Sequence, residues 1–86
     1  MAIQIIWSDA ALDDLYAVRV GLADDTAARV GRLIVEATDC LVDFPDRGRE
    51  GRAAGTRELP LPGLPWRLIY RWTKDTVTVL RLLAAP

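Results

Sequence analysis

The pattern of hydrophobic and polar positions changes its period twice along this chain. Residues 3–7 alternate in the manner of a short strand rich in β-branched side chains. Two stretches follow in which apolar residues recur at threes and fours, which predicts two helices joined by a short turn. The expected N-terminal caps are Ser8-Asp9 and Asp24-Asp25-Thr26, and the helices are expected to end near Gly21 and before Pro45.

A period of two returns in the last third of the chain. Strands are predicted at about 56–61, 65–72 and 76–83, with turns at Pro62-Gly63 and Lys74-Asp75. The order is therefore one strand, two helices and a three-stranded antiparallel meander. This order predicts an α+β fold in which an α-helical hairpin packs on one face of a small sheet.

Alternation within the middle strand of the meander assigns its side chains to two faces. We expect the aromatic face to pack on the helices, because large apolar rings belong in the core. The arginines of this strand then lie on the opposite face. The helix-facing set is Trp66, Leu68, Tyr70 and Trp72, and the opposite set is Arg67, Ile69 and Arg71.

The two flanking strands extend these faces. Arg81 is expected beside the arginines of the middle strand, and Glu58 and Pro60 are expected on the same face. Arg57 is expected at the margin of the sheet on the helix side, where it would pair with an acid of a helix. The leucines expected to join the core are Leu59, Leu61, Leu80 and Leu82.

Composition adds a division of charge to this picture. The chain has 86 residues, of which 51% are hydrophobic, and this suits one small domain spanning residues 1–86. Residues 1–46 carry nine acids against three arginines, a net charge of −6. Residues 47–86 carry seven arginines and Lys74 against three acids, a net charge of +5. The second half would meet a polyanionic or acidic partner, unless each half only solvates its own surface.

Composition also argues against several kinds of chemistry. The chain has no histidine, so the commonest metal ligand and the commonest general base are missing, and no metal or other cofactor is expected. Cys40 is the only cysteine; it lies on the apolar helix face, is expected in the core and fits a reducing cytoplasm. No apolar run has the length of a membrane span, and the N-terminus lacks the basic segment of a secretory signal. A cytoplasmic protein without a membrane partner is therefore expected.

The arginines remain as candidate functional groups. Arg67 and Arg81, with Arg71, could bind phosphates and stabilise the transition state of RNA cleavage, with Glu58 or Glu50 as general base. An arginine is a poor proton donor, because its pKa lies far above 7. The alternative is that the arginines bind acidic groups of a protein partner. The full set of candidate binding residues is Arg49, Arg52, Arg57, Arg67, Arg71 and Arg81.

Several motifs follow one another in a characteristic order. Residues 10–15 read AALDDL, and Phe44-Pro45 closes the second apolar stretch. A basic, glycine-punctuated loop then leads into GTREL at 55–59. The longest motif is GLPWRLIYR at 63–71, followed by VTVLR at 77–81. In this order and spacing the motifs resemble the RelE/ParE superfamily, the toxins of type II toxin–antitoxin (plasmid stabilisation) modules, over nearly the whole chain.

The GTREL segment and the proline before the aromatic are most similar to the ParE branch. That resemblance implies a toxin that inhibits DNA gyrase by binding it, without catalysis, and that a cognate antitoxin neutralises in a heteromeric complex. RelE-like relatives instead cleave mRNA on the ribosome, with the arginine of an aromatic–Arg–Leu–x–Tyr motif, here Arg67, and with lysines on the preceding strand. Here that strand carries Glu58 and Pro60. Some relatives use a glutamate base and a late histidine acid; Glu50 could stand for the first, whereas the second is absent here.

The C-terminal segment departs from both branches. Members of the superfamily usually continue past the last strand with a histidine-containing, basic or aromatic segment, whereas this chain reads LLAAP at 82–86. The resemblance therefore implies a ParE-like gyrase inhibitor as the first expectation. Two alternatives stay open: a RelE-like, ribosome-dependent mRNA interferase, and an attenuated or non-toxic homologue that only binds the antitoxin.

Overall fold

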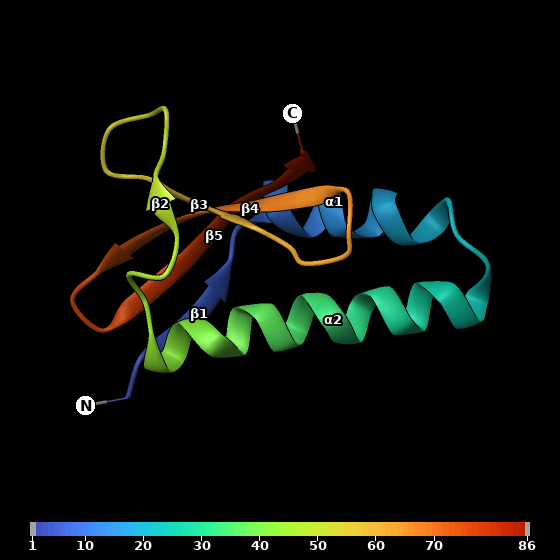
Figure 1. Ribbon diagram of the computed structural model, residues 1–86, viewed down its shortest axis with the longest axis horizontal. Coiled ribbons are helices and arrows are strands. Elements are labelled where there is room, and N and C mark those ends of the chain that lie inside the picture. Colours follow the sequence, from blue (N-terminus) through green and yellow to red (C-terminus); the bar gives the residue numbers. More distant parts are fainter. Residues whose placement is uncertain (1, 86) are drawn as a thin grey trace.

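The computed structural model describes residues 2–85, which form two helices and five strands around one hydrophobic core (Figure 1). Pro86, the last residue of the short C-terminal segment, lies outside the described residues. None of the described helices has the length and apolar content needed to cross a membrane. In chain order the elements are β1 (Gln4–Trp7), α1 (Asp9–Val20), α2 (Asp24–Asp43), β2 (Arg49–Glu50), β3 (Arg57–Pro60), β4 (Trp66–Thr73) and β5 (Thr76–Ala84).

The strands form one mixed sheet in the order β1-β5-β4-β3-β2. β3, β4 and β5 are the predicted antiparallel meander, which together with the helical hairpin confirms the α+β fold. β1 pairs with β5 in parallel, so the first and last strands are neighbours. Figure 1 shows α2 along one side of the twisted sheet and the loop between β2 and β3 on the opposite side. The edge strand β2, two residues within the basic loop, is an element that the sequence pattern did not predict.

The helix boundaries follow from local capping chemistry. The Ser8 hydroxyl accepts a hydrogen bond from the Ala11 N–H at 3.1 Å and caps α1, as predicted, and α1 ends at Val20 before Gly21. The predicted cap of α2 is wrong. Ala23 occupies the N-cap position without a side-chain bond, and Asp25 only accepts a bond from the neighbouring Thr26 N–H. The two acids still lie in the first turn, where the helix dipole favours negative charge.

The core lies between α2, α1 and the helix-facing side of the sheet. α2 is strongly amphipathic and buries one stripe of its surface, while polar residues cover the remainder. Each aliphatic side chain that is fully buried in this way stabilises the fold by roughly 1.5–3 kcal/mol. The core cluster comprises Ala11, Val30, Ile34, Leu41, Leu59, Leu61, Leu68, Tyr70, Val77, Val79 and Leu82.

A β-bulge in the β4–β5 pair corrects the predicted register. Ile69 pairs with Arg81 and Tyr70 pairs with Val79, so Leu80 is the extra residue of β5. The predicted core position of Leu80 is therefore wrong, because this side chain is only half-buried. Val79 takes the core position instead and is fully buried. Strict alternation from Val79 would place Arg81 on the helix-facing side of the sheet. The bulge at Leu80 places Arg81 on the opposite face, beside Ile69.

Two further residues lie closer to solvent than predicted. Cys40 is exposed instead of buried, because it lies at the edge of the apolar stripe of α2, where no strand covers it. Trp72 is 39% exposed, since β4 extends past the helices at this end. The predicted turns at Pro62-Gly63 and Lys74-Asp75 are present, and both Gly63 and Lys74 have positive φ, 75° and 53°.

Tyr70 connects the sheet to the segment that follows α2. Its hydroxyl donates to the Pro45 carbonyl and accepts from the Gly48 N–H, each at 2.8 Å, while its ring is fully buried. Burial raises the pKa of the Tyr70 hydroxyl, although the Gly48 hydrogen bond acts in the opposite direction. A Cβ atom on Gly48 would lie 2.7 Å from this hydroxyl, so only glycine fits there. Tyr70 thereby fixes the chain between α2 and β2.

Candidate interaction surfaces

The sheet face that points away from the helices, the open face, carries most of the arginines. Alternation predicts this arrangement, and the strand register places Arg71 opposite Thr78 on this face. Two more rows of side chains cross the strands beside that pair. One row is Arg49, Glu58, Ile69 and Arg81, and the next is Pro60, Arg67 and Leu83.

Arg67 is held by the protein itself. Its Nε donates to Glu58 Oε1 at 3.1 Å, and its terminal nitrogen donates to the Ala84 carbonyl. Only 13% of the Arg67 side chain and 11% of the Glu58 side chain is exposed. The second Glu58 oxygen accepts the backbone N–H of Arg52 at 3.3 Å. The structure thus brings the candidate phosphate ligand and the candidate base together as an ion pair in which each neutralises the other.

Arg81 is also paired, with an acid of α1. Its Nε and Nη2 donate to the two oxygens of Asp14 at 2.7 and 3.0 Å, and Asp14 also accepts the Leu82 N–H at 2.9 Å. The Arg81 hydrogen bond holds the pKa of Asp14 below its ordinary value, against the effect of burial. Asp14 therefore binds the edge of β5 where this strand extends beyond β1. The sequence pattern did not predict this contact, which joins residues 67 positions apart.

Arg57 lies on the helix side of the sheet margin, but its predicted pairing with a helix acid is wrong. Its Nη1 donates to the carbonyls of Gly48 at 2.8 Å and of Asp46 at 3.1 Å. The guanidinium carbon lies 6.0 Å from the centre of the exposed Trp72 ring, within reach of a cation–π contact. Backbone carbonyls therefore bind the Arg57 guanidinium in place of the helix carboxylate that was expected there.

Three of the six candidate arginines, the arginine triad of Arg49, Arg52 and Arg71, remain available. All three are exposed, and within residues 2–85 their guanidinium groups form no hydrogen bond or ion pair. Glu50, the other candidate base, is exposed and lies opposite Arg57, on the face away from Arg67. It is therefore not assembled with the candidate phosphate ligand. Among the described residues no group of three histidine, cysteine or acidic side chains could hold a metal ion.

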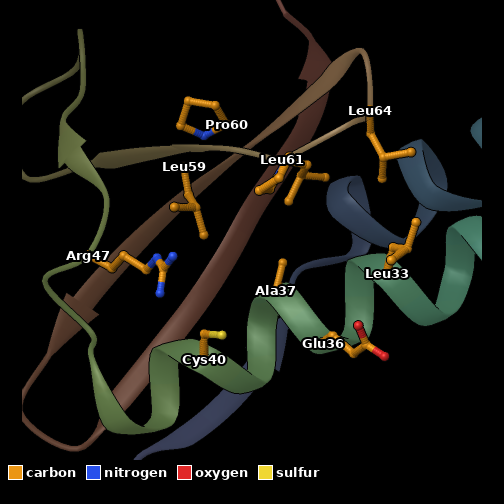
Figure 2. Close-up of a pocket in the computed structure, with 10 residues that line it drawn as sticks. Leu33, Glu36, Ala37, Cys40, Arg47, Leu59, Pro60, Leu61 and Leu64 are labelled. Carbon is orange, nitrogen blue, oxygen red and sulfur yellow. The ribbon is translucent and has the colours of Figure 1, made fainter.

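An apolar hollow lies between α2 and the segment from β3 to β4, and sequence reasoning missed it. Its volume is about 320 Å³. Figure 2 shows Leu59 pointing from β3 toward α2, Leu64 and Leu33 pointing toward each other, and the Arg47 guanidinium between β3 and Cys40. The lining residues are Leu33, Glu36, Ala37, Cys40, Arg47, Leu59, Pro60, Leu61, Pro62 and Leu64.

The hollow has a recognisable cause in the sequence. β3 ends at Pro60, and Pro62 follows in the turn after it, on the other side of Leu61; proline cannot donate a backbone hydrogen bond to a further strand. β2 pairs only with Arg57 and Glu58, so the rest of β3 has no outer neighbour. A leucine-rich segment without a neighbouring strand is a signal for a binding groove, although it does not say what the groove binds.

Comparison with known proteins agrees with this fold. Residues 5–85 match the family described as "ParE toxin of type II toxin-antitoxin system, parDE". A curated protein of Sinorhizobium fredii named "Putative toxin Y4kP" is 43% identical over 61 residues, which is 71% of this chain. The match spans 62% of the length of that relative.

Two solved structures have the same fold. One belongs to the chromosomal ParDE toxin–antitoxin system of P. aeruginosa; it has a TM-score of 0.86 at 23% identity and covers 98% of this chain and 97% of its own. The other is the toxin–antitoxin complex RelBE2 of Mycobacterium tuberculosis, with a TM-score of 0.66 at 25% identity, covering 98% of this chain and 99% of its own.

Proposed function

We propose that this chain, which belongs to the ParE family of toxins of type II toxin–antitoxin systems, inhibits DNA gyrase by binding it. We also propose that a cognate antitoxin neutralises it. The match over residues 5–85 is the observation that carries this proposal. It covers both helices, the strands β2 to β5 and all of β1 except Gln4, and so includes both candidate surfaces.

The state of the candidate catalytic residues supports binding over chemistry. A ribonuclease of this kind needs a free arginine for the phosphate and a base near it. Arg67 and Glu58 instead bind each other, and Arg81 binds Asp14. The sequence also has no histidine that would act as the acid. This arrangement favours a toxin that traps its target over one that cleaves RNA.

The apolar hollow is the proposed site for the antitoxin. Its leucines and prolines offer an apolar surface that an amphipathic peptide segment would cover. Glu36 and Arg47 also line it, so the peptide could pair a charge of either sign at the rim. A disordered antitoxin tail that folds on the toxin would gain its binding energy mainly from apolar burial here.

The target is tested by expressing the chain without its antitoxin. Growth is expected to stop while mRNA stays intact, and the purified protein is expected to inhibit the supercoiling activity of gyrase. Addition of the cognate antitoxin in equal amount is expected to restore supercoiling. Ribosome-dependent mRNA cleavage with normal supercoiling would contradict the proposal in favour of an mRNA interferase. Unchanged growth would contradict toxicity itself.

The antitoxin site is tested by the variant Ala37→Glu, which places a carboxylate in the hollow. Covering an unpaired charge is costly, so the affinity for the antitoxin is expected to fall about a hundredfold in a titration of the purified proteins. The matched control is Val35→Glu, since Val35 is on the same helix, is 53% exposed and does not line the hollow. This variant is expected to bind normally.

Cys40 provides an independent readout of the same site. It is exposed, lines the hollow and is the only cysteine of the chain, so a maleimide reports on the hollow alone. Bound antitoxin is expected to slow this labelling at least tenfold. Equal labelling rates with and without antitoxin would place the antitoxin elsewhere, as would normal binding by Ala37→Glu.

A further inference from the structure

We propose that the arginine triad binds the phosphate backbone of duplex DNA. This inference goes beyond the proposed function and does not depend on gyrase being the target. It starts from a difference among the arginines of the open face. Arg67 and Arg81 have acidic partners, whereas Arg49, Arg52 and Arg71 are exposed and have none within residues 2–85.

The three free arginines come together around the loop between β2 and β3. Arg49 lies directly opposite Glu58 on the open face, and the Arg52 N–H donates to the Glu58 carboxylate. Arg71 reaches the same loop from β4, because its Nε lies 3.8 Å from the place of a Cβ atom on Gly55. Two sides of one loop therefore carry the triad. The positive φ of Gly55, 76°, shapes the turn against which Arg71 lies.

The surface beside the triad offers hydroxyl donors. Thr78 lies opposite Arg71, and Thr73 pairs with Thr76 further along the same face. Two acids neighbour the triad. Glu58 is already neutralised by Arg67, whereas Glu50, next to Arg49 in β2, is exposed and lies opposite Arg57 on the other face of the sheet. In the turn between β4 and β5, Asp75 accepts a hydrogen bond from the Thr76 hydroxyl. Asp75 is the last acid in the sequence. Within residues 2–85 this corner thus has three unpaired positive charges, and the Thr78 hydroxyl opposite Arg71 and the Thr73 hydroxyl further along the face could also donate to phosphate oxygens.

These groups suit a nucleic-acid backbone better than an acidic peptide. Contacts to DNA phosphates come from arginine, threonine and backbone N–H groups on a polar surface. A bound peptide instead needs apolar side chains buried in a pocket at the centre of the interface. On this protein the apolar hollow lies elsewhere, between α2 and β3, and none of the triad arginines lines it.

The acidic half of the chain does not prevent this contact. Nine acids lie in residues 1–46, which form β1 and the two helices, whereas the triad lies on the face turned away from the helices. Salt screens exposed charges over about 8 Å at physiological ionic strength, less than the roughly 10 Å between packed layers. The acids would therefore orient the helices away from DNA and leave the local attraction of the triad in place.

The number of arginines sets the expected strength. Each neutralised phosphate contributes about −0.9 to the slope of the logarithm of the binding constant against the logarithm of salt, so the triad gives about −2.7. Without other contacts, that slope corresponds to dissociation constants of tens of micromolar near 20 mM salt and about a millimolar near 100 mM. Contact of this strength becomes effective when a partner already holds the protein beside DNA.

The test measures binding of the full chain to a fluorescent duplex of about 20 base pairs, between about 20 and 150 mM salt. The triad variant Arg49→Gln/Arg52→Gln/Arg71→Gln is expected to lose binding at least a hundredfold at the lowest salt. The matched control is Arg19→Gln/Arg29→Gln/Arg32→Gln, which removes the same charge from exposed positions on the helices. This control is expected to bind within about threefold of the unaltered chain. Thermal unfolding confirms that both variants are folded.

Three outcomes would overturn the proposal. Equal losses in the two triple variants would mean that only net charge matters. A salt slope near zero would mean that phosphates are not contacted. The third outcome has two parts: the unaltered chain binds the duplex no more tightly than albumin does, and it binds a labelled polyglutamate peptide that the triad variant does not bind. That result would assign the triad to an acidic protein segment.

Discussion

Replacing Glu58 by glutamine is expected to lower the free energy of unfolding by about 2 kcal/mol at pH 7. Glu58 and Arg67 form an ion pair with 11% and 13% of their side chains exposed, and the variant leaves Arg67 without a counter-charge. Losing one partner of a fully buried pair costs about 3–5 kcal/mol. The cost here is smaller, because some water reaches both groups and glutamine still accepts hydrogen bonds. Urea unfolding measures the difference.

Glu50→Gln is the matched control, since Glu50 is exposed on the neighbouring strand and has no ion-pair partner within residues 2–85. Its effect is expected to stay within about 0.5 kcal/mol. The double variant Glu58→Gln/Arg67→Gln is expected to lose less stability than the two single variants together, with a coupling of about 1 kcal/mol or more. If Glu58→Gln were as stable as the unaltered chain, Arg67 would be free to serve a target, and the ribonuclease interpretation would regain support.

Removal of the Tyr70 hydroxyl is expected to cost 2–3 kcal/mol. The variant Tyr70→Phe keeps the buried ring but leaves the Gly48 N–H and the Pro45 carbonyl without their partner. A buried polar group that loses its hydrogen bond costs about 1–3 kcal/mol, and here two groups are affected. In a domain of this size the midpoint of thermal unfolding is expected to fall by about 10 °C or more.

Tyr16→Phe serves as the control for this change, because Tyr16 is 72% exposed and its hydroxyl forms no hydrogen bond within residues 2–85. A shift of less than about 2 °C is expected for it. If Tyr70→Phe unfolded at the same temperature as Tyr16→Phe, water would be replacing the lost hydroxyl. The segment between α2 and β2 would then be held by Arg57 and not by Tyr70.

The sequence predicted the elements and their faces well, because those depend on periodicity. The alternation of residues 65–72 was enough to place Tyr70 in the core and Arg67 on the open face. Periodicity carries no information on a bulge, so Leu80 was assigned one position out of register. It also cannot indicate that an exposed helix edge lacks cover, which is why Cys40 was expected in the core.

The candidate site was predictable only as a set of residue types. Six arginines were assigned to one binding role, yet three of them are held by Glu58, Asp14 and loop carbonyls. Which arginine finds a partner depends on contacts between residues far apart in the chain, such as Asp14 with Arg81. The hollow beside α2 depends likewise on where β2 stops pairing with β3. Both features follow from tertiary packing and leave little trace in a local pattern.

The pairing of β1 with β5 has a consequence for the way the protein is made. Ser8 donates to the Leu80 carbonyl across 72 positions, and Trp7 pairs with Val79. Because a chain is synthesised from its N-terminus, β1 has no partner strand until β5 has left the ribosome. The pairing of β1 with β5 also closes a loop of nearly the whole chain, which costs conformational entropy. A nascent copy from which β5 has not yet emerged would lack the strand that joins β1 to the rest of the sheet, and so would lack the completed open face.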